Sequence, residues 1–187
     1  MNFLDDLKKN YQEEPSRLTH IEGVVTWSMK LASHLSLDVE AMRTAAYLHD
    51  FTKPYPEAWH LDIFTQYQVR LPADFPAFAY HGISAAVVGK HRYHIEHEDI
   101  FKAVYYHTTG RPRMNLFEKV LMFADKTEPS RPYDEADELR KEALQDFEKA
   151  FVKMLRLLKE YDQNQKRPIT EATALTYDYY LSKMEAP

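Results

Sequence analysis

The stretch AMRTAAYLHDFTKP, residues 41–54, shows the periodicity that recurs along the chain, and it contains the candidate functional residues His49, Asp50 and Lys53. Its apolar residues lie three and four positions apart, as in Met42 and Ala45, and this spacing predicts a helix with one buried face. His49 continues that face, Asp50 follows directly, and Pro54 ends the helical pattern. The stretch therefore predicts an imidazole and a carboxylate side by side at the buried end of a helix.

The same periodicity extends over most of the 187 residues, while alternation typical of strands is rare. With only 4 glycines the chain has few residues for tight hairpins or phosphate-binding loops, which disfavours all-β and Rossmann-type folds. We predict an all-α protein with one domain over 1–187, a core at about 15–160 and a C-terminal helical extension at 161–187. Further helices are expected at 15–35, 57–69, 78–91, 98–109, 116–125, 134–159 and 172–184, with Gly110 just past the end of one of them.

Composition excludes several classes of function. The absence of cysteine rules out disulfides, thiolate metal ligands and a cysteine nucleophile. A net charge of -5 offers little attraction for nucleic acid, and no uncharged run reaches the ~20 apolar residues of a membrane span. Residues 1–10 lack the basic segment followed by an apolar segment that is typical of a signal peptide. We therefore expect a cytoplasmic protein that binds neither nucleic acid nor membrane.

Ionisable side chains interrupt the apolar faces of five predicted helices. A single histidine there is usually a hydrogen-bonded core residue, but several buried imidazoles and carboxylates are costly unless they share a partner. A metal centre would stabilise all of them together. Six candidates exceed the three or four protein ligands of a mononuclear zinc site, so a dinuclear site is predicted, and nitrogen and oxygen donors favour iron, manganese or zinc. The six are His20, His49, Asp50, His81, His107 and Asp125.

This ordered set resembles the H…HD…H…H…D motif of the HD-domain metal-dependent phosphohydrolases. The stretches LHDFTK (48–53), HTTGRPRM (107–114) and FADKTEPSR (123–131) are similar to the bacterial YqeK-type branch, the symmetrical bis(5′-nucleosyl)-tetraphosphatases. The resemblance covers roughly 17–150. The chain departs from the family pattern at Phe51 and Thr52, and within HGISAA (81–86).

The resemblance implies an HD-domain helical bundle around two divalent metal ions, with iron as the expected metal and manganese or zinc as alternatives. It assigns one ion to His20, His49, Asp50 and Asp125, and the other to Asp50, His81 and His107. It also implies symmetrical hydrolysis of diadenosine tetraphosphate into two ADP. In this scheme a metal-activated hydroxide attacks phosphorus.

Basic residues near these ligands are candidates for binding phosphate. Arg17 lies one helical turn before His20, Lys53 follows Asp50 by three residues, and Arg131 follows Asp125. We predict Asp50, Lys53 and Arg131 as catalytic residues. The predicted substrate-binding residues are Arg17, Lys53, Thr109, Gly110, Arg111, Glu128 and Arg131. By contrast, His91, His94 and His97 have few apolar neighbours and are predicted at the surface or in a loop.

Alternative functions keep part of this scheme. The same centre could hydrolyse a nucleoside monophosphate or a deoxynucleotide, the chain could be a nucleotide-sensing module without activity, or a di-iron centre could perform oxidation, which the basic residues disfavour. Product analysis and oxygen consumption would distinguish them. The sequence leaves open the native metal, the nucleobase preference, the physiological substrate, the role of the C-terminal helix, and the oligomeric state, including a homodimer.

Overall fold

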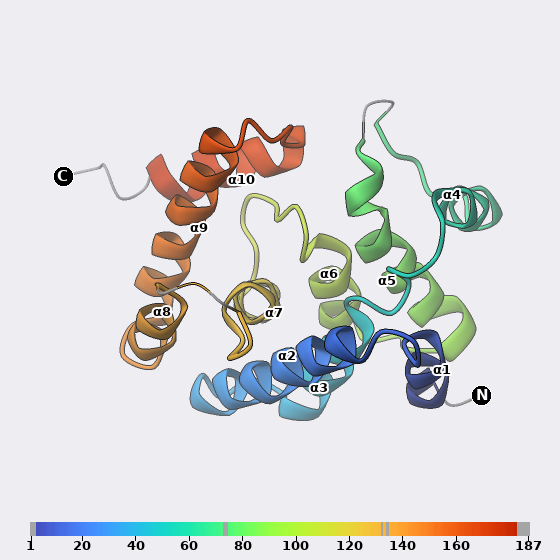
Figure 1. The fold of residues 1–187 in the computed structure, drawn as a ribbon, viewed down its shortest axis with the longest axis horizontal. Coiled ribbons are helices and arrows are strands. Elements are labelled where there is room, and N and C mark those ends of the chain that lie inside the picture. Colours follow the sequence, from blue (N-terminus) through green and yellow to red (C-terminus); the bar gives the residue numbers. More distant parts are fainter. Residues whose placement is uncertain (1–2, 73–74, 132, 134, 183–187) are drawn as a thin grey trace.

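The computed structural model describes residues 3–72, 75–131, 133 and 135–182, and every regular element among them is helical (Figure 1). The all-α prediction is therefore confirmed. The helices are α1 (Phe3–Asn10), α2 (Pro15–His34), α3 (Val39–Leu48), α4 (Glu57–Gln66), α5 (Tyr80–Tyr93), α6 (Glu98–Tyr106), α7 (Leu116–Thr127), α8 (Glu135–Ala143), α9 (Phe147–Asn164) and α10 (Glu171–Leu181), with a short 3-10 turn, η1, at Ala77–Ala79.

Local sequence signals explain several helix ends. Pro15 occupies the first position of α2, where its missing N–H costs nothing. Asn115 caps α7 in a capping box with Glu118. Helix α6 ends at Tyr106, three residues before the predicted end, and Gly110 then adopts a left-handed φ of 67°. The chain turns sharply after His107 as a result.

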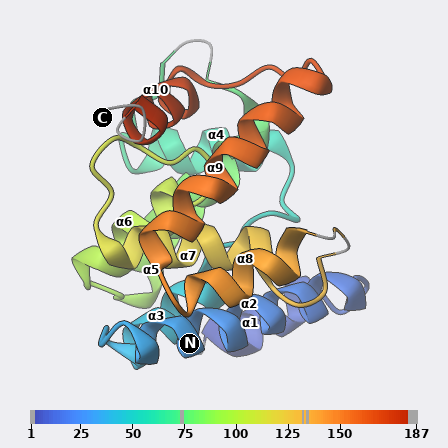
Figure 2. The same cartoon turned by 90° about the vertical axis from the view of Figure 1, so that its left-hand side faces the viewer.

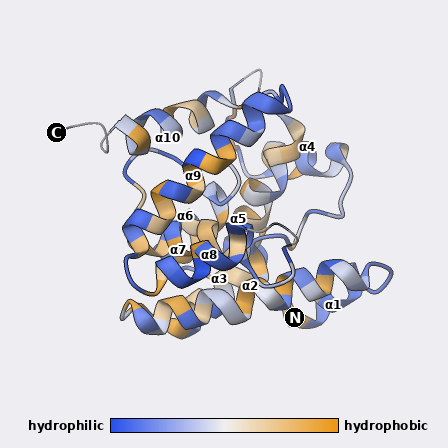
Figure 3. Cartoon of the chain, turned by 60° about the vertical axis from the view of Figure 1, so that its left-hand side comes forward, coloured by the Kyte–Doolittle hydropathy of each residue, from blue (hydrophilic) through white to orange (hydrophobic). Residues whose placement is uncertain are grey.

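The prediction of one long helix over 134–159 is wrong. The amphipathic stretch 134–159 forms two helices, α8 and α9, instead of one long helix. The break comes at Asp146, whose side chain caps α9 by accepting a hydrogen bond from the Lys149 amide. Both helices bury apolar residues against the same bundle, with α9 banded by apolar and hydrophilic residues (Figure 3). Asp134, Lys183 and Met184 of the predicted helices lie outside the described residues.

No helix was predicted before Pro15, yet α1 forms there and buries Leu7. Immediately after α1, Tyr11 is almost fully buried and its hydroxyl donates a hydrogen bond of 2.6 Å to the Asp50 backbone carbonyl. The N-terminal segment therefore supports the chain at the HD dipeptide.

Helices α2, α3, α5, α6 and α7 pack around the core, and α8 and α9 pack along α7 (Figures 1 and 2). Fully buried apolar residues fill the space between them, including Val24, Leu31, Met42, Val104 and Leu121. The histidine-bearing ends of α3 and α6 therefore meet α2, α5 and α7 inside the protein. None of the helices in the described part of the chain is long and apolar enough to cross a membrane.

Helix α10 packs over the loop that follows His107. The Tyr180 hydroxyl accepts a hydrogen bond of 2.7 Å from the Met114 amide, and the Thr176 hydroxyl lies 3.4 Å from the Thr109 carbonyl. A Cβ at Gly110 would lie 2.7 Å from Thr176 Cγ2, so glycine permits this close approach. The C-terminal helix therefore fixes the path of the loop beside the candidate site.

Candidate metal centre

The structure brings all six predicted ligands together in the core. They come from α2, the end of α3, α5, the end of α6, and α7, and none is more than 6% exposed. Their potential ligand atoms form two groups that share Asp50. The convergence depends on the tertiary packing of five helices, which the spacing along the chain could only suggest.

The first group surrounds Asp50 Oδ2 and Asp125 Oδ1. His20 Nε2 lies 3.2 Å from Asp125 Oδ1 and 3.9 Å from Asp50 Oδ2, and His49 Nε2 lies 3.9 Å and 3.7 Å from the same atoms. Two atoms that bind one ion at about 2.1 Å are separated by about 3.0–3.5 Å. The group is therefore close to the dimensions of a metal coordination sphere.

The second group surrounds the other oxygen of Asp50. His81 Nε2 lies 3.2 Å from Asp50 Oδ1, His107 Nε2 lies 3.9 Å from it, and the two Nε2 atoms are 3.2 Å apart. Asp50 thus directs one oxygen into each group. A carboxylate in this position is suited to bridge two ions.

Hydrogen bonds at the outer ring nitrogens fix the orientation of three imidazoles. The Nδ1 atoms of His49, His81 and His107 lie 2.5–2.9 Å from the backbone carbonyls of the residues three positions earlier, and a carbonyl can only accept. In the neutral tautomer that these contacts select, each Nε2 carries a lone pair that points into the centre.

The described residues supply fewer hydrogen-bond donors than these lone pairs require. The Nε2 atoms of His81 and His107 face each other as two acceptors, and His49 Nε2 is buried without a hydrogen-bond partner among the described residues. An unsatisfied buried acceptor is destabilising, whereas a bound cation would satisfy all three nitrogens. The donor set of imidazole nitrogens and carboxylate oxygens fits a divalent metal.

Electrostatics keep the ligands in the forms that bind metal. Burial lowers the pKa of His49 and, with neighbouring imidazoles, lowers that of His107 well below its usual range. Burial alone would raise the pKa of Asp50, but His49, His81 and Lys53 hold it well below its usual value. Burial alone would also raise the pKa of Asp125, but Lys126, His20 and His49 hold it well below its usual value. The lowered pKa values favour the neutral imidazoles of His49 and His107 and the ionised carboxylates of Asp50 and Asp125, the forms that bind metal.

Glu128 orients His20. Its Oε1 lies 3.0 Å from His20 Nδ1, and its carboxylate also accepts hydrogen bonds from the amide and hydroxyl of Ser130. This leaves His20 Nε2 directed at Asp125. A carboxylate behind a ligating imidazole fixes the ring and raises its basicity. Glu128 was predicted to bind substrate, and the structure places it behind the ligand.

Four cationic side chains contact the two central carboxylates. Arg17 Nη1 lies 3.2 Å from Asp50 Oδ2, and Lys53 Nζ lies 3.1 Å from the same oxygen. Lys126 Nζ is 2.8 Å from Asp125 Oδ2, and Arg131 Nη2 is 3.0 Å from Asp125 Oδ1. All four are partly exposed. The structure thus places the predicted Arg17, Lys53 and Arg131 at the centre.

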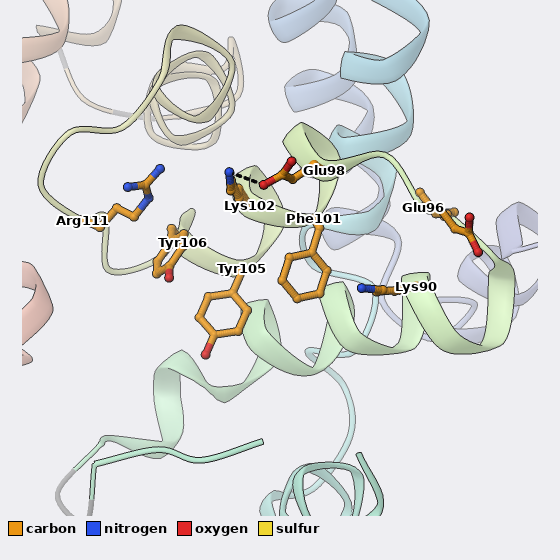
Figure 4. Close-up of a pocket in the computed structure, with 9 residues that line it drawn as sticks. Lys90, Glu96, Glu98, Phe101, Lys102, Tyr105, Tyr106 and Arg111 are labelled. Atoms are coloured by element: carbon orange, nitrogen blue, oxygen red, sulfur yellow. Dashed lines mark ion pairs between the residues drawn. The ribbon is translucent and has the colours of Figure 1, made fainter. Parts of the chain in front are cut away.

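The other predicted substrate residues lie elsewhere. Thr109 is buried, with its hydroxyl bonded to the Gly110 carbonyl, and Gly110 faces α10. Arg111 forms a paired contact with Glu118, at 2.7 and 2.8 Å, and stacks on Tyr106. It lines a surface pocket of about 640 Å³ with Lys90, Phe101, Lys102 and Tyr105, which contains none of the candidate ligands (Figure 4). The prediction that these residues bind substrate remains a prediction.

Sequence reasoning gave no role to two polar residues at the centre. The Thr108 hydroxyl lies 3.3 Å from His81 Nε2 and 3.1 Å from His107 Nε2. Lys126 pairs with Asp125. Each residue directly follows a predicted ligand in the chain, and that adjacency is the signal that could have identified it.

A buried polar network supports His81 from behind. The Thr52 hydroxyl donates to the His81 carbonyl at 2.8 Å and lies 2.7 Å from Ser84 Oγ, which in turn lies 2.8 Å from His60 Nδ1. Thr52 and Ser84 of this network lie in the stretches that depart from the family pattern. By contrast, His91, His94 and His97 are exposed, as predicted.

Comparisons with known proteins agree with this site. Residues 17–130 match the family described as HD domain. The chain is 31% identical to a symmetrical bis(5′-nucleosyl)-tetraphosphatase of Bacillus subtilis, over 89% of this chain and 90% of that protein. A protein of Halalkalibacterium halodurans with the same name is 28% identical over 88% and 89% of the two chains.

A solved structure gives the same result for the fold. A predicted HD superfamily hydrolase involved in NAD metabolism, from Clostridium acetobutylicum, superposes with a TM-score of 0.89 at 30% identity, covering 97% of this chain and 96% of that chain. The matched region contains all six candidate ligands. The chain therefore belongs to the HD domain family, together with the symmetrical bis(5′-nucleosyl)-tetraphosphatases that it resembles over most of its length.

Proposed function

We propose that this protein is a metal-dependent hydrolase that cleaves diadenosine tetraphosphate symmetrically into two ADP. The observation that carries the proposal is the buried set of four imidazoles and two carboxylates next to four partly exposed cations. Within this set His49 Nε2 has no hydrogen-bond partner among the described residues, and the Nε2 atoms of His81 and His107 face each other. The names of the relatives in Bacillus subtilis and Halalkalibacterium halodurans support the choice of substrate.

The proposed centre contains two divalent ions. His20, His49, Asp50 and Asp125 would hold one, and Asp50, His81 and His107 the other. The two groups sharing Asp50 support this count. Iron is the proposed metal, and manganese or zinc would suit the same nitrogen and oxygen donors. Bound divalent ions supply Lewis acidity toward phosphoryl oxygens and a hydroxide nucleophile near neutral pH.

The protein's own residues orient the substrate. Arg17, Lys53, Lys126 and Arg131 contact Asp50 and Asp125 in the structure. Divalent ions on these carboxylates would neutralise them and leave the four cations available for a polyphosphate. Guanidinium groups bind phosphate oxygens in pairs, and the charges stabilise negative charge on the leaving group.

Symmetrical cleavage requires one water molecule per substrate. A bond forms between the water oxygen and a phosphorus at the centre of the tetraphosphate, and the P–O bond to the neighbouring central phosphate breaks. Each half leaves as ADP. The partial burial of the cations, between 26% and 38% exposed, supports a substrate that binds with its phosphates at the centre and its ends outside.

The test is product analysis. Purified protein is loaded with ferrous iron or manganese, given diadenosine tetraphosphate, and its nucleotide products are resolved by chromatography with and without chelator. We expect ADP alone, and its loss on chelation. ATP with AMP would show a different cleavage position, and no product would reject the substrate. His49→Ala is expected to remove both metal and activity, and activity in this variant without metal would refute the centre.

A further inference from the structure

Thr108 is the polar residue closest to the His81 and His107 side of the centre that the proposed scheme leaves without a role. Its hydroxyl oxygen lies 3.1 Å from His107 Nε2 and 3.3 Å from His81 Nε2, and the residue is half-buried. The neighbouring Thr109 directs its own hydroxyl to the Gly110 carbonyl instead. The two threonines of the HTTG stretch are thus structurally different.

A single hydroxyl hydrogen cannot satisfy both imidazoles. Both Nε2 atoms are acceptors, because their Nδ1 atoms donate to the carbonyls of Phe78 and Val104. A divalent ion on these nitrogens would engage both lone pairs. The Thr108 O–H would then be free to donate to another acceptor at the same place, and a phosphoryl oxygen is such an acceptor.

The distribution of donors favours this role. Arg17, Lys126 and Arg131 contact the centre on the side of Asp50 Oδ2 and Asp125. On the opposite side, around His81 and His107, Thr108 is the side-chain donor that the structure records within hydrogen-bond distance of both nitrogens. The group around His81 and His107 also has three protein ligands instead of four. These residues would leave a bound ion more positions for substrate oxygens than the four-residue group would.

The backbone at Thr108 is held in place on both sides. His107 is anchored by its bond to the Val104 carbonyl, the Gly110 amide donates to the Tyr106 carbonyl at 2.7 Å, and Thr176 of α10 contacts the Thr109 carbonyl. A hydroxyl held this firmly needs little reorganisation to bind a developing negative charge, which is the property that makes such donors effective in catalysis.

We infer that Thr108 is a catalytic residue whose hydroxyl donates a hydrogen bond to a phosphoryl oxygen bound on the His81 and His107 side. The inference rests on the proposed function and adds an uncharged phosphate contact to it. Thr108 orients the phosphoryl group and stabilises the charge that develops on its oxygen. It differs from Arg17, Lys126 and Arg131, which contact Asp50 Oδ2 or Asp125, and from Lys53, which contacts both oxygens of Asp50.

The test compares Thr108→Val, which removes the hydroxyl at nearly constant volume, with Thr108→Ser, which keeps it. Thr44→Val, at a half-buried threonine of α3 whose hydroxyl bonds the Glu40 carbonyl, is the matched control. Three quantities are measured for each manganese-loaded protein: metal content, the dissociation constant for ADP by calorimetry, and the turnover of diadenosine tetraphosphate. We expect Thr108→Val to keep its metal, bind ADP about tenfold more weakly and turn over about 10–100-fold more slowly.

Thr108→Ser is expected to recover most of the ADP affinity and most of the turnover, and Thr44→Val is expected to match the wild type. Loss of metal from Thr108→Val would overturn the inference in favour of a structural role, and unchanged ADP binding and turnover would overturn it outright. The metal and ADP measurements do not depend on cleavage of diadenosine tetraphosphate. A wild-type protein that binds ADP through Thr108 but releases no ADP from that substrate would refute the proposed function alone.

Discussion

Gly23 of α2 lies directly against the carboxylate of Glu128. A Cβ built at Gly23 would overlap Glu128 Oε2 and would lie 3.1 Å from its Cδ. The same carboxylate holds His20 Nδ1 at 3.0 Å. The missing side chain at position 23 therefore creates the space in which Glu128 orients a candidate metal ligand one turn away on the same helix.

Gly23→Ala is expected to displace Glu128 and to lower metal affinity about 10–100-fold, because ligating histidines depend on such supporting partners. Competition with a chromophoric chelator measures the affinity. Glu128→Gln should lower it in the same direction. Thr26→Ala, at an exposed position of α2, is the control and should bind metal like the wild type. Unchanged affinity in Gly23→Ala would show that His20 does not need Glu128 for its orientation.

Asp50 supplies one oxygen to each group of ligands, whereas His107 belongs to one group. After loading and gel filtration, Asp50→Asn should therefore lose both ions, and His107→Ala should keep about one ion per chain. Elemental analysis of the purified variants gives the count. His94→Ala, an exposed histidine, should load fully. Retention of a full ion in Asp50→Asn would argue against a bridging role.

Thr52, Ser84 and His60 form a buried chain of hydrogen bonds behind His81. Thr52→Val and Ser84→Ala should each lower the free energy of unfolding by about 1–3 kcal/mol, because each leaves a buried polar partner unsatisfied. The double variant should lose less than the sum of the two, since both remove the same contact. Urea titration of the four proteins measures the coupling. Strictly additive losses would mean that the two hydroxyls act independently.

Tyr180 connects α10 to the loop after His107 through the Met114 amide. Tyr180→Phe removes the acceptor and leaves a buried N–H unpaired, so unfolding should become easier by about 1–3 kcal/mol. Turnover should fall as well, because the loop carries Thr108. Tyr161→Phe, at an exposed tyrosine, serves as the control for both measurements. Full activity in a destabilised Tyr180→Phe would separate the C-terminal helix from the site.

Acid should destabilise the metal-free protein. Burial lowers the pKa of three histidines, so between their folded-state pKa and the unfolded value near 6.5 the unfolded chain binds more protons and stability falls as pH falls. The carboxyls whose pKa is held low contribute a further loss below about pH 4. The groups are His49, His60 and His107, and Asp50, Asp125 and Glu128. The urea midpoint of chelator-treated protein should be lower at pH 5.5 than at pH 7.5, and equal midpoints would contradict the prediction.

The sequence alone determined the helical class and the identity of the candidate ligands. Apolar spacing of three and four residues is a local property, and it predicted helices from Pro15 onward because each needs one buried face. The prediction of a single helix over 134–159 was wrong, since α8 and α9 share the same periodicity and only the cap at Asp146 separates them. The amphipathic pattern does not encode such a break.

The tertiary structure decided which polar groups act together. That Asp50 faces both groups, that Glu128 supports His20, and that Thr108 rather than Thr109 faces His81 and His107 all depend on how five helices and a loop are oriented. Arg111 shows the opposite case: it follows a ligand closely in sequence, yet it pairs with Glu118 of α7 and lines a surface pocket away from the candidate ligands. Side-chain direction at the end of a helix is set by packing between distant segments, and spacing along the chain does not contain it.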